Sequence, residues 1–207
     1  MIFLADDYLE KYCNSFTYLL LTSYKRQYSF DCIQRIISYS KCMSEFEKSN
    51  VTIIAFDSYK RIYEEMFLEK TDNEELNPYD IFGWCGYAYI HLFLSLQITF
   101  EALFYVIPFE EMLSLYHLYH EMNITQLENY AKEKLKYSIL HIIMKRWKMS
   151  NSVLSKKTGI AVSTINALRY KKRDIAKFEA SKLLLIANAL LVKIETLLPN
   201  IHLDLQQ

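Results

Sequence analysis

Residues that interrupt helices are almost absent from this chain: three Gly and three Pro occur among its 207 residues. All-β folds need many more of these residues for their turns, and disordered chains are usually rich in them. Hydrophobic residues make up 52% of the sequence, which is enough apolar material for a sizeable core. The sequence therefore predicts a folded, mainly α-helical protein.

Helical segments can be placed from apolar spacing and from capping residues. Ser29 offers a cap for one helix, and Asn123 offers a cap for another. Pro108 suits the first turn of a helix, whereas the run VTIIAF at 51–56 fits a short strand as well as a helix. We expect helices over about 1–28, 30–48, 52–69, 81–107, 109–118 and from 126 onward, with a loop over 70–80.

The stretch 81–100 contains no charged residue, and its length equals that of a membrane span. His91 and Gln97 lie inside it, however, and it is flanked by the acidic residues Asp80 and Glu101, with no Lys or Arg to set an orientation. We interpret the stretch as a buried helix pair or as the core of a dimer. A regulator tethered to a membrane through 81–107 is the alternative interpretation.

Charge is distributed unevenly along the chain, although the formal net charge is zero. Residues 1–131 contain nine Lys or Arg and nineteen Asp or Glu, whereas residues 132–207 contain fifteen and five. We therefore expect an acidic, aromatic helical domain over 1–131 and a basic domain over 132–207, with a helix running across the boundary. The basic domain favours a polyanionic partner, but attraction between the two halves or to a partner subunit explains the asymmetry as well.

The titratable residues form no pattern typical of an enzyme or a metal site. The four Cys are scattered without zinc-ligand spacing and no signal peptide opens the sequence, so we expect reduced thiols in a cytoplasmic protein. His117, His120 and Glu121 lie within one helical turn, but aromatic packing explains these histidines better than a metal does. Because no phosphate-binding glycine loop and no catalytic triad can be assigned, we expect no enzymatic activity, no cofactor and no metal.

A basic segment near the C-terminus has the pattern of two short helices joined by a tight turn. Residues 134–173 contain eleven Lys or Arg and no acidic residue, and they include the string SNSVLSKKTGIAVSTINALRYKKR at 150–173. Ser150 can cap the first helix of the pair. Gly159 stands where a left-handed turn needs a residue without a Cβ, and Ile165 and Leu168 then pack the second helix onto the core.

Residues 133–198 resemble the Xre/lambda-repressor class of helix-turn-helix domains. The resemblance implies a five-helix domain whose first helix carries an apolar stripe from Leu135 to Trp147. The chain departs from the class at Ala161, where a Ser or Thr cap is usual, and at Lys171 and Leu191, where Gly is common. The side chains expected to face inward from the closing helices are Leu184, Ala187, Leu190, Ile194 and Leu197.

In this class the second helix of the motif lies in the major groove of DNA, with its N-terminal residues against base edges. By position, the resemblance implies base contacts from Val162, Ser163, Asn166, Ala167 and Arg169, the last of which can reach a base or a phosphate. Since Asn pairs with adenine and small apolar side chains contact the thymine methyl group, we expect an A·T-rich half-site. The residues placed for phosphate contacts are Asn151, Lys156, Lys157, Thr164, Tyr170, Lys171, Lys172 and Arg173.

The resemblance implies a sequence-specific transcriptional regulator that binds double-stranded DNA as a homodimer on a palindromic operator and represses its own gene. We expect the dimer contacts in the aromatic N-terminal domain, which also suits a protein partner or an effector. The alternative is an antitoxin, whose N-terminal domain would neutralise a toxin and whose DNA binding would repress the operon.

Overall fold

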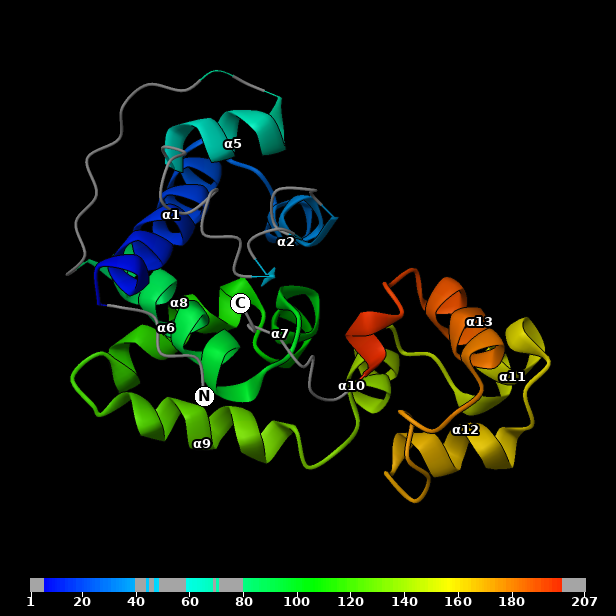
Figure 1. Ribbon diagram of the computed structural model, residues 1–207. Helices are drawn as coiled ribbons and strands as arrows, with labels where there is room; N and C mark the ends of the chain where they lie inside the picture. The colour runs from blue at the N-terminus through cyan, green and yellow to red at the C-terminus, as the bar shows by residue number, and fades with distance from the viewer. Residues whose placement is uncertain are drawn as a thin grey trace.

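The computed structural model describes residues 6–39, 44, 47–48, 59–68, 70 and 80–198. Within these residues the chain is helical and contains no strand, as expected from its shortage of Gly and Pro. In Figure 1 the helices up to α9 gather on one side of the molecule, and the last four α-helices gather on the other. The elements are α1 (Asp6–Lys25), α2 (Phe30–Tyr39), α5 (Tyr59–Phe67), α6 (Ile81–Leu96), α7 (Phe100–Val106), α8 (Phe109–Tyr119), α9 (Ile124–Lys134), α10 (Ile139–Arg146), α11 (Asn151–Thr158), α12 (Val162–Arg169), α13 (Ala180–Leu190) and the 3-10 helix η1 (Glu195–Leu197).

Several predicted helix ends are confirmed by hydrogen bonds at the caps. The amide of Cys32 donates to the Ser29 hydroxyl at 3.2 Å, so Ser29 caps α2. The Asn123 side chain accepts from the amide of Thr125 and caps α9, which begins at Ile124, two residues earlier than expected. Pro108 occupies the N-cap of α8 instead of its first turn. The expectations for 51–56 and for 71–79 lie outside the described residues.

Aromatic side chains fill the core between the N-terminal helices. Phe100 of α7 stacks on Phe93 of α6 with the ring centroids 4.4 Å apart, and on Phe16 of α1 at 4.8 Å. Tyr18 meets Tyr63 of α5 edge-on at 6.1 Å. All five rings are almost completely buried, so these aromatic residues stabilise the chain's own fold through their large apolar area.

Helices α1 and α6 cross closely at Gly86. A Cβ atom placed on Gly86 would lie 2.0 Å from the Oγ1 atom of Thr17 and 2.9 Å from its backbone nitrogen. Only glycine fits such an approach, because a backbone atom cannot rotate away as the end of a side chain can. The glycine therefore sets the distance between these two helices.

The uncharged stretch forms the helix pair α6 and α7, as the sequence indicates. The chain turns at Gln97, whose φ of 53° is left-handed, and the Thr99 hydroxyl then caps α7 by accepting from the amide of Ala102 at 3.0 Å. No single described helix is long and apolar enough to cross a membrane; α6 and α7 reach that length only together, bent by 109°. Most of their apolar side chains are buried against α1, α2 and α8, which accounts for the hydrophobicity of the stretch.

The C-terminal helices share a continuous core with the N-terminal ones. Helix α9 crosses residue 132, as expected, and ends at Lys134, whose ammonium donates to the carbonyl of Val106 at 3.1 Å. Ile139 and Ile143 of α10 are buried in the same cluster as α7. The buried carboxylate of Glu101 accepts from the Lys193 amide at 3.0 Å and from the Thr196 hydroxyl, which fastens α7 to the segment around η1.

Candidate nucleic-acid interface

Helices α11 and α12 form the predicted helix-turn-helix. The Ser150 hydroxyl accepts from the amide of Val153 at 3.2 Å and caps α11. Gly159 ends that helix with a φ of 73°, in the left-handed conformation that its lack of a Cβ permits. Ala161 is the N-cap residue of α12 and makes no side-chain hydrogen bond, so no cap side chain bonds the first amides of the helix.

The small core under the motif agrees with the sequence only in part, because Trp147, expected on the apolar stripe, is 40% exposed and Ile194 is half-buried. Leu154, Ile165 and Leu168 are buried as predicted. The prediction for Leu184 is wrong, because its side chain is 50% exposed. Ala187 and Leu190 are buried as predicted, and Leu183 and Ile186 are the other buried residues of α13. Leu135 precedes the first helix of the motif, since the break at 135–138 separates α9 from α10.

The N-terminal face of α12 is open. Val162 is 44% exposed, Ser163 is exposed, and Thr164, Asn166 and Ala167 are half-buried. Ile165 and Leu168 turn the opposite face of the helix into the core. Four of the five residues predicted to contact bases therefore have part of their side chains available on one helical face.

The fifth residue, Arg169, is also half-buried, but its guanidinium makes hydrogen bonds within the protein. Its Nη1 atom donates to Oδ1 of Asn151 at 2.5 Å, and Asn151 Nδ2 donates to Oδ1 of Asn166 at 3.2 Å. Its Nη2 atom lies 3.5 Å from Nδ1 of His141, and its guanidinium carbon lies 5.6 Å from the ring centroid of Tyr170. The structure thus joins three residues with separately predicted DNA contacts: Asn151 for phosphate, Asn166 for a base, and Arg169 for either.

Two further residues of this network, Ser138 and His141, are not among those predicted from the sequence. The Ser138 hydroxyl caps α10 by accepting from the His141 amide, and it donates to the carbonyl of Arg169 at 2.8 Å. His141 stacks on Tyr137 with the ring centroids 4.5 Å apart. Burial, together with the nearby charges of Arg169 and Lys145, lowers the pKa of His141, so its neutral ring can accept from the guanidinium. A Ser placed directly before an apolar run is the one sequence signal that points to this site.

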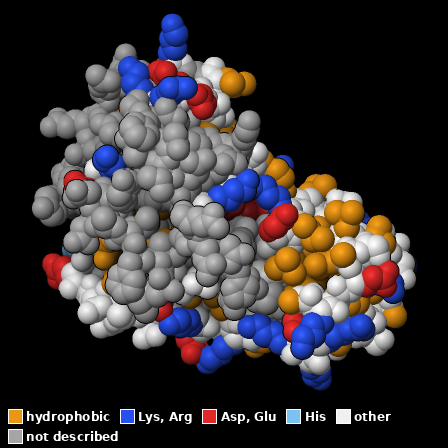
Figure 2. Space-filling model, in the orientation of Figure 1, with side chains coloured by type: hydrophobic (Ala, Val, Ile, Leu, Met, Phe, Trp, Pro, Cys, Tyr) orange, Lys and Arg blue, Asp and Glu red, His pale blue; other side chains and the backbone are white. Residues whose placement is uncertain are grey.

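Basic side chains surround this face. Lys156, Lys157 and Lys172 are exposed. Lys171 donates to the carbonyl of Leu135 at 2.5 Å, and Arg173 lies 4.9 Å from the ring centroid of Phe178, so both already have a contact within the protein. Figure 2 shows Lys and Arg side chains along the lower edge of the molecule, over α12 and the turn after it, which makes this edge positively charged.

The two positions where the class favours Gly do have left-handed backbones. Lys171 has a φ of 55°, and Leu191 has a φ of 54° at the end of α13. Both residues carry a Cβ and are therefore strained by roughly 1 kcal/mol each. Lys171 and Leu191 in place of Gly therefore lower the stability of these helix ends, but the backbone keeps the left-handed turn.

The histidines of α8 take part in aromatic packing. His120 stacks on Tyr116 with the ring centroids 4.4 Å apart, and His117 meets the same ring edge-on at 5.6 Å. Among the residues described, no group of three or more His, Cys, Asp or Glu side chains is arranged to hold a metal ion.

Comparison with protein families supports the assignment of the motif. Residues 140–199 match the Cro/C1-type HTH DNA-binding domain family. The C-terminal part of the chain is thus a helix-turn-helix domain of the predicted class, whereas the N-terminal part has no assigned family. Comparison with curated proteins and with solved structures gave no significant match.

Proposed function

We propose that this protein is a cytoplasmic, sequence-specific DNA-binding regulator that inserts α12 into the major groove. The observation that carries the proposal is the open N-terminal face of α12 in a Cro/C1-type unit, with a positively charged edge around it. A helix of this size fits the major groove, and its first residues then meet base edges.

The base contacts are assigned to Val162, Ser163, Asn166 and Ala167. Asn166 uses one Oδ1 lone pair for Asn151, which leaves its Nδ2 group and a second lone pair for adenine. Phosphate contacts are assigned to the exposed basic residues Lys156, Lys157 and Lys172, and to Thr164 and Tyr170. These contacts contribute salt-dependent affinity for DNA but no sequence specificity.

Arg169 has a different role in this proposal from the one expected from its position alone. Its guanidinium holds Asn151, and Asn151 in turn holds Asn166, so it orients a base-contacting side chain. To bind phosphate, Lys171 must give up or share its hydrogen bond to the Leu135 carbonyl, and Arg173 must do the same with its contact to the Phe178 ring. We therefore place these two below Lys172 as contributors to affinity.

Two copies of the chain are proposed to bind a palindromic operator, because one small domain contacts few base pairs. Most of the described aromatic residues in 1–131, where this contact was expected, lie in the core of the chain or pack against it. Exposed apolar side chains also occur on the DNA-binding unit itself, at Leu184, Leu185 (46% exposed) and Leu191 (67% exposed). These leucines are our first candidates for the contact between copies.

Autorepression is tested by titrating the full chain against the duplex upstream of its own gene and against a scrambled duplex, at two salt concentrations. We expect tight binding to the native duplex only. Lys172→Ala should weaken binding to both duplexes and reduce the salt slope by about one, whereas Lys182→Ala on α13 should match wild type. Equal, weak binding to both duplexes would contradict a sequence-specific regulator.

The antitoxin function is a second proposal, and it divides the chain into an acidic partner-binding domain at 1–131 and a DNA-binding domain at 132–207. The antitoxin proposal requires a neighbouring gene whose product inhibits cell growth when expressed alone. Co-expression of residues 1–207 with that product should then restore growth. A harmless neighbour, or toxicity that the chain does not relieve, would rule this function out.

A further inference from the structure

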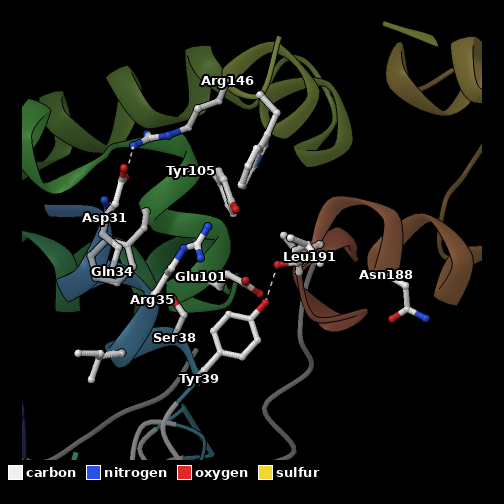
Figure 3. Close-up of a pocket in the computed structure, with 14 residues that line it drawn as sticks. Asp31, Gln34, Arg35, Ser38, Tyr39, Glu101, Tyr105, Arg146, Asn188 and Leu191 are labelled. Carbon is white, nitrogen blue, oxygen red and sulfur yellow. Dashed lines mark hydrogen bonds and ion pairs between the residues drawn. The ribbon is translucent and has the colours of Figure 1, made fainter. Parts of the chain in front are cut away.

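A cavity of about 980 Å³ lies where the N-terminal helices meet the DNA-binding unit. One wall comes from α2 and α7, and the other comes from the ends of α10 and α13 (Figure 3). None of the residues assigned to DNA contacts lines it. The cavity is large enough for a small organic molecule.

Two guanidinium groups face this cavity. Arg146, the last residue of α10, approaches the Asp31 carboxylate at 3.6 Å, and that carboxylate is 82% exposed. Arg35 of α2 has no carboxylate oxygen within 4.0 Å among the residues that the structure describes. Figure 3 shows both arginines beside the cavity. An ion pair with a solvated carboxylate is weak, so the residues that the structure describes leave most of the donor capacity of both guanidinium groups unused.

The buried carboxylate of Glu101, which lines the cavity, already accepts hydrogen bonds within the protein. Glu101 accepts from the Lys193 amide at 3.0 Å and from the hydroxyl of Thr196. The Tyr39 hydroxyl donates to the carbonyl of Leu191 at 2.7 Å and closes the same end. Glu101 therefore connects α7 to the segment around η1, and Asp31, which also lines the cavity, faces Arg146. The two arginines are the cationic groups of the lining that a ligand can reach.

Part of the remaining wall is aromatic. Tyr105 of α7 and Trp147, which follows α10, both line the cavity, and the Arg146 guanidinium carbon lies 6.0 Å from the ring centroid of Tyr105. Such a wall binds a flat apolar body, while guanidinium groups recognise carboxylates and phosphates in bidentate fashion.

We propose that this cavity binds a small organic anion with a planar apolar body, held by Arg35 and Arg146 and packed on Tyr105 and Trp147. The walls belong to α2 and α7 on one side and to α10 and α13 on the other, so the bound anion bridges the N-terminal helices and the DNA-binding unit. The site does not depend on the proposed operator binding, and its test needs no DNA.

The test measures binding of 4-hydroxybenzoate to the full chain by calorimetry and by Trp147 fluorescence in a Trp84→Phe background, which leaves Trp147 as the single tryptophan. We expect saturable binding and a change in Trp147 emission. The neutral analogue 4-hydroxybenzamide and inorganic sulfate should each bind about tenfold more weakly or worse, because each lacks one half of the recognised chemistry.

Variants identify the site. Arg146→Gln and Arg35→Gln should each weaken 4-hydroxybenzoate binding about tenfold or more, and Arg146→Lys should recover part of the loss. Lys177→Gln removes one exposed positive charge outside the cavity and should bind as wild type does. Melting temperatures of all variants check that the fold is kept. Absence of saturable binding, equal binding of the amide or of sulfate, or an equal loss in Lys177→Gln would overturn the proposal.

Discussion

The Nη1 atom of Arg169, the last residue of α12, donates a 2.5 Å hydrogen bond to the Oδ1 atom of Asn151, the first residue of α11. The bond joins the two helices of the motif at the end opposite to their tight turn. Because Asn151 also donates to Asn166, the orientation of a base-contacting amide depends on a residue three positions further along α12.

Arg169→Lys should lower operator affinity about tenfold, since lysine keeps the charge but loses the fork that reaches both Asn151 and His141. Asn151→Ala should have a similar effect. In the double variant the losses should not add, with a coupling energy of about 1 kcal/mol. Arg173→Lys is the matched control and should stay close to wild type. Fully additive losses in equilibrium binding titrations would show that the hydrogen bond is not used in the complex.

Replacement of Gly86 and of Gly159 by alanine should have unequal effects on stability. Gly86→Ala should lower the free energy of unfolding by about 1–3 kcal/mol, because its Cβ meets the backbone of Thr17. Gly159→Ala should cost about 1 kcal/mol through its left-handed φ alone, since nothing lies within 4 Å of the added atom. Denaturant unfolding measures both. A stabilised Gly86→Ala, as helix propensity alone predicts, would mean that α1 and α6 do not cross as closely as described.

Relief of strain at Leu191 should stabilise the chain. Leu191→Gly removes the Cβ from a residue with a φ of 54° and should raise the free energy of unfolding by about 1 kcal/mol. Ala189→Gly, inside α13, provides the opposite control and should lower it by up to about 1 kcal/mol. Thermal unfolding in which both variants are equally destabilised would contradict the left-handed cap.

The stability of the chain should depend on His141 below neutral pH. Its pKa is lowered in the fold from an ordinary value near 6.5, so the unfolded chain binds more protons in that range. The free energy of unfolding should therefore fall as the pH drops below about 6.5 towards the lowered pKa. His141→Gln should show a smaller fall between pH 7.5 and 5.5 in denaturant titrations. An unchanged fall in this variant would place the titrating group elsewhere.

The local features of the helix-turn-helix were predictable because each depends on residues close in sequence. Ser150 and Gly159 mark helix ends through their own backbone chemistry, and Ile165 and Leu168 follow helical spacing. Sequence spacing places Leu184 inward where the structure buries Leu183, because Leu183, Leu184 and Leu185 are chemically equivalent in the sequence. Contacts with α11 decide which of these leucines is buried.

The contacts between distant segments were not predictable in the same way. Nothing in the sequence links Ser138 to the carbonyl of Arg169, 31 residues away, or Glu101 to Thr196, 95 residues away. The cavity between α2, α7, α10 and α13 likewise depends on how the two groups of helices meet. Composition and spacing describe single helices, whereas these features depend on the three-dimensional packing of several helices.

Selection of bound sequences from a pool of random duplexes tests the central claim, that α12 reads DNA sequence, most directly. The full chain should enrich an inverted repeat of A·T-rich half-sites, and Asn166→Ala or Ser163→Ala should relax the preference at particular base pairs while Lys182→Ala leaves it unchanged. Failure to enrich any motif, or a motif that stays the same in both α12 variants, would contradict the account.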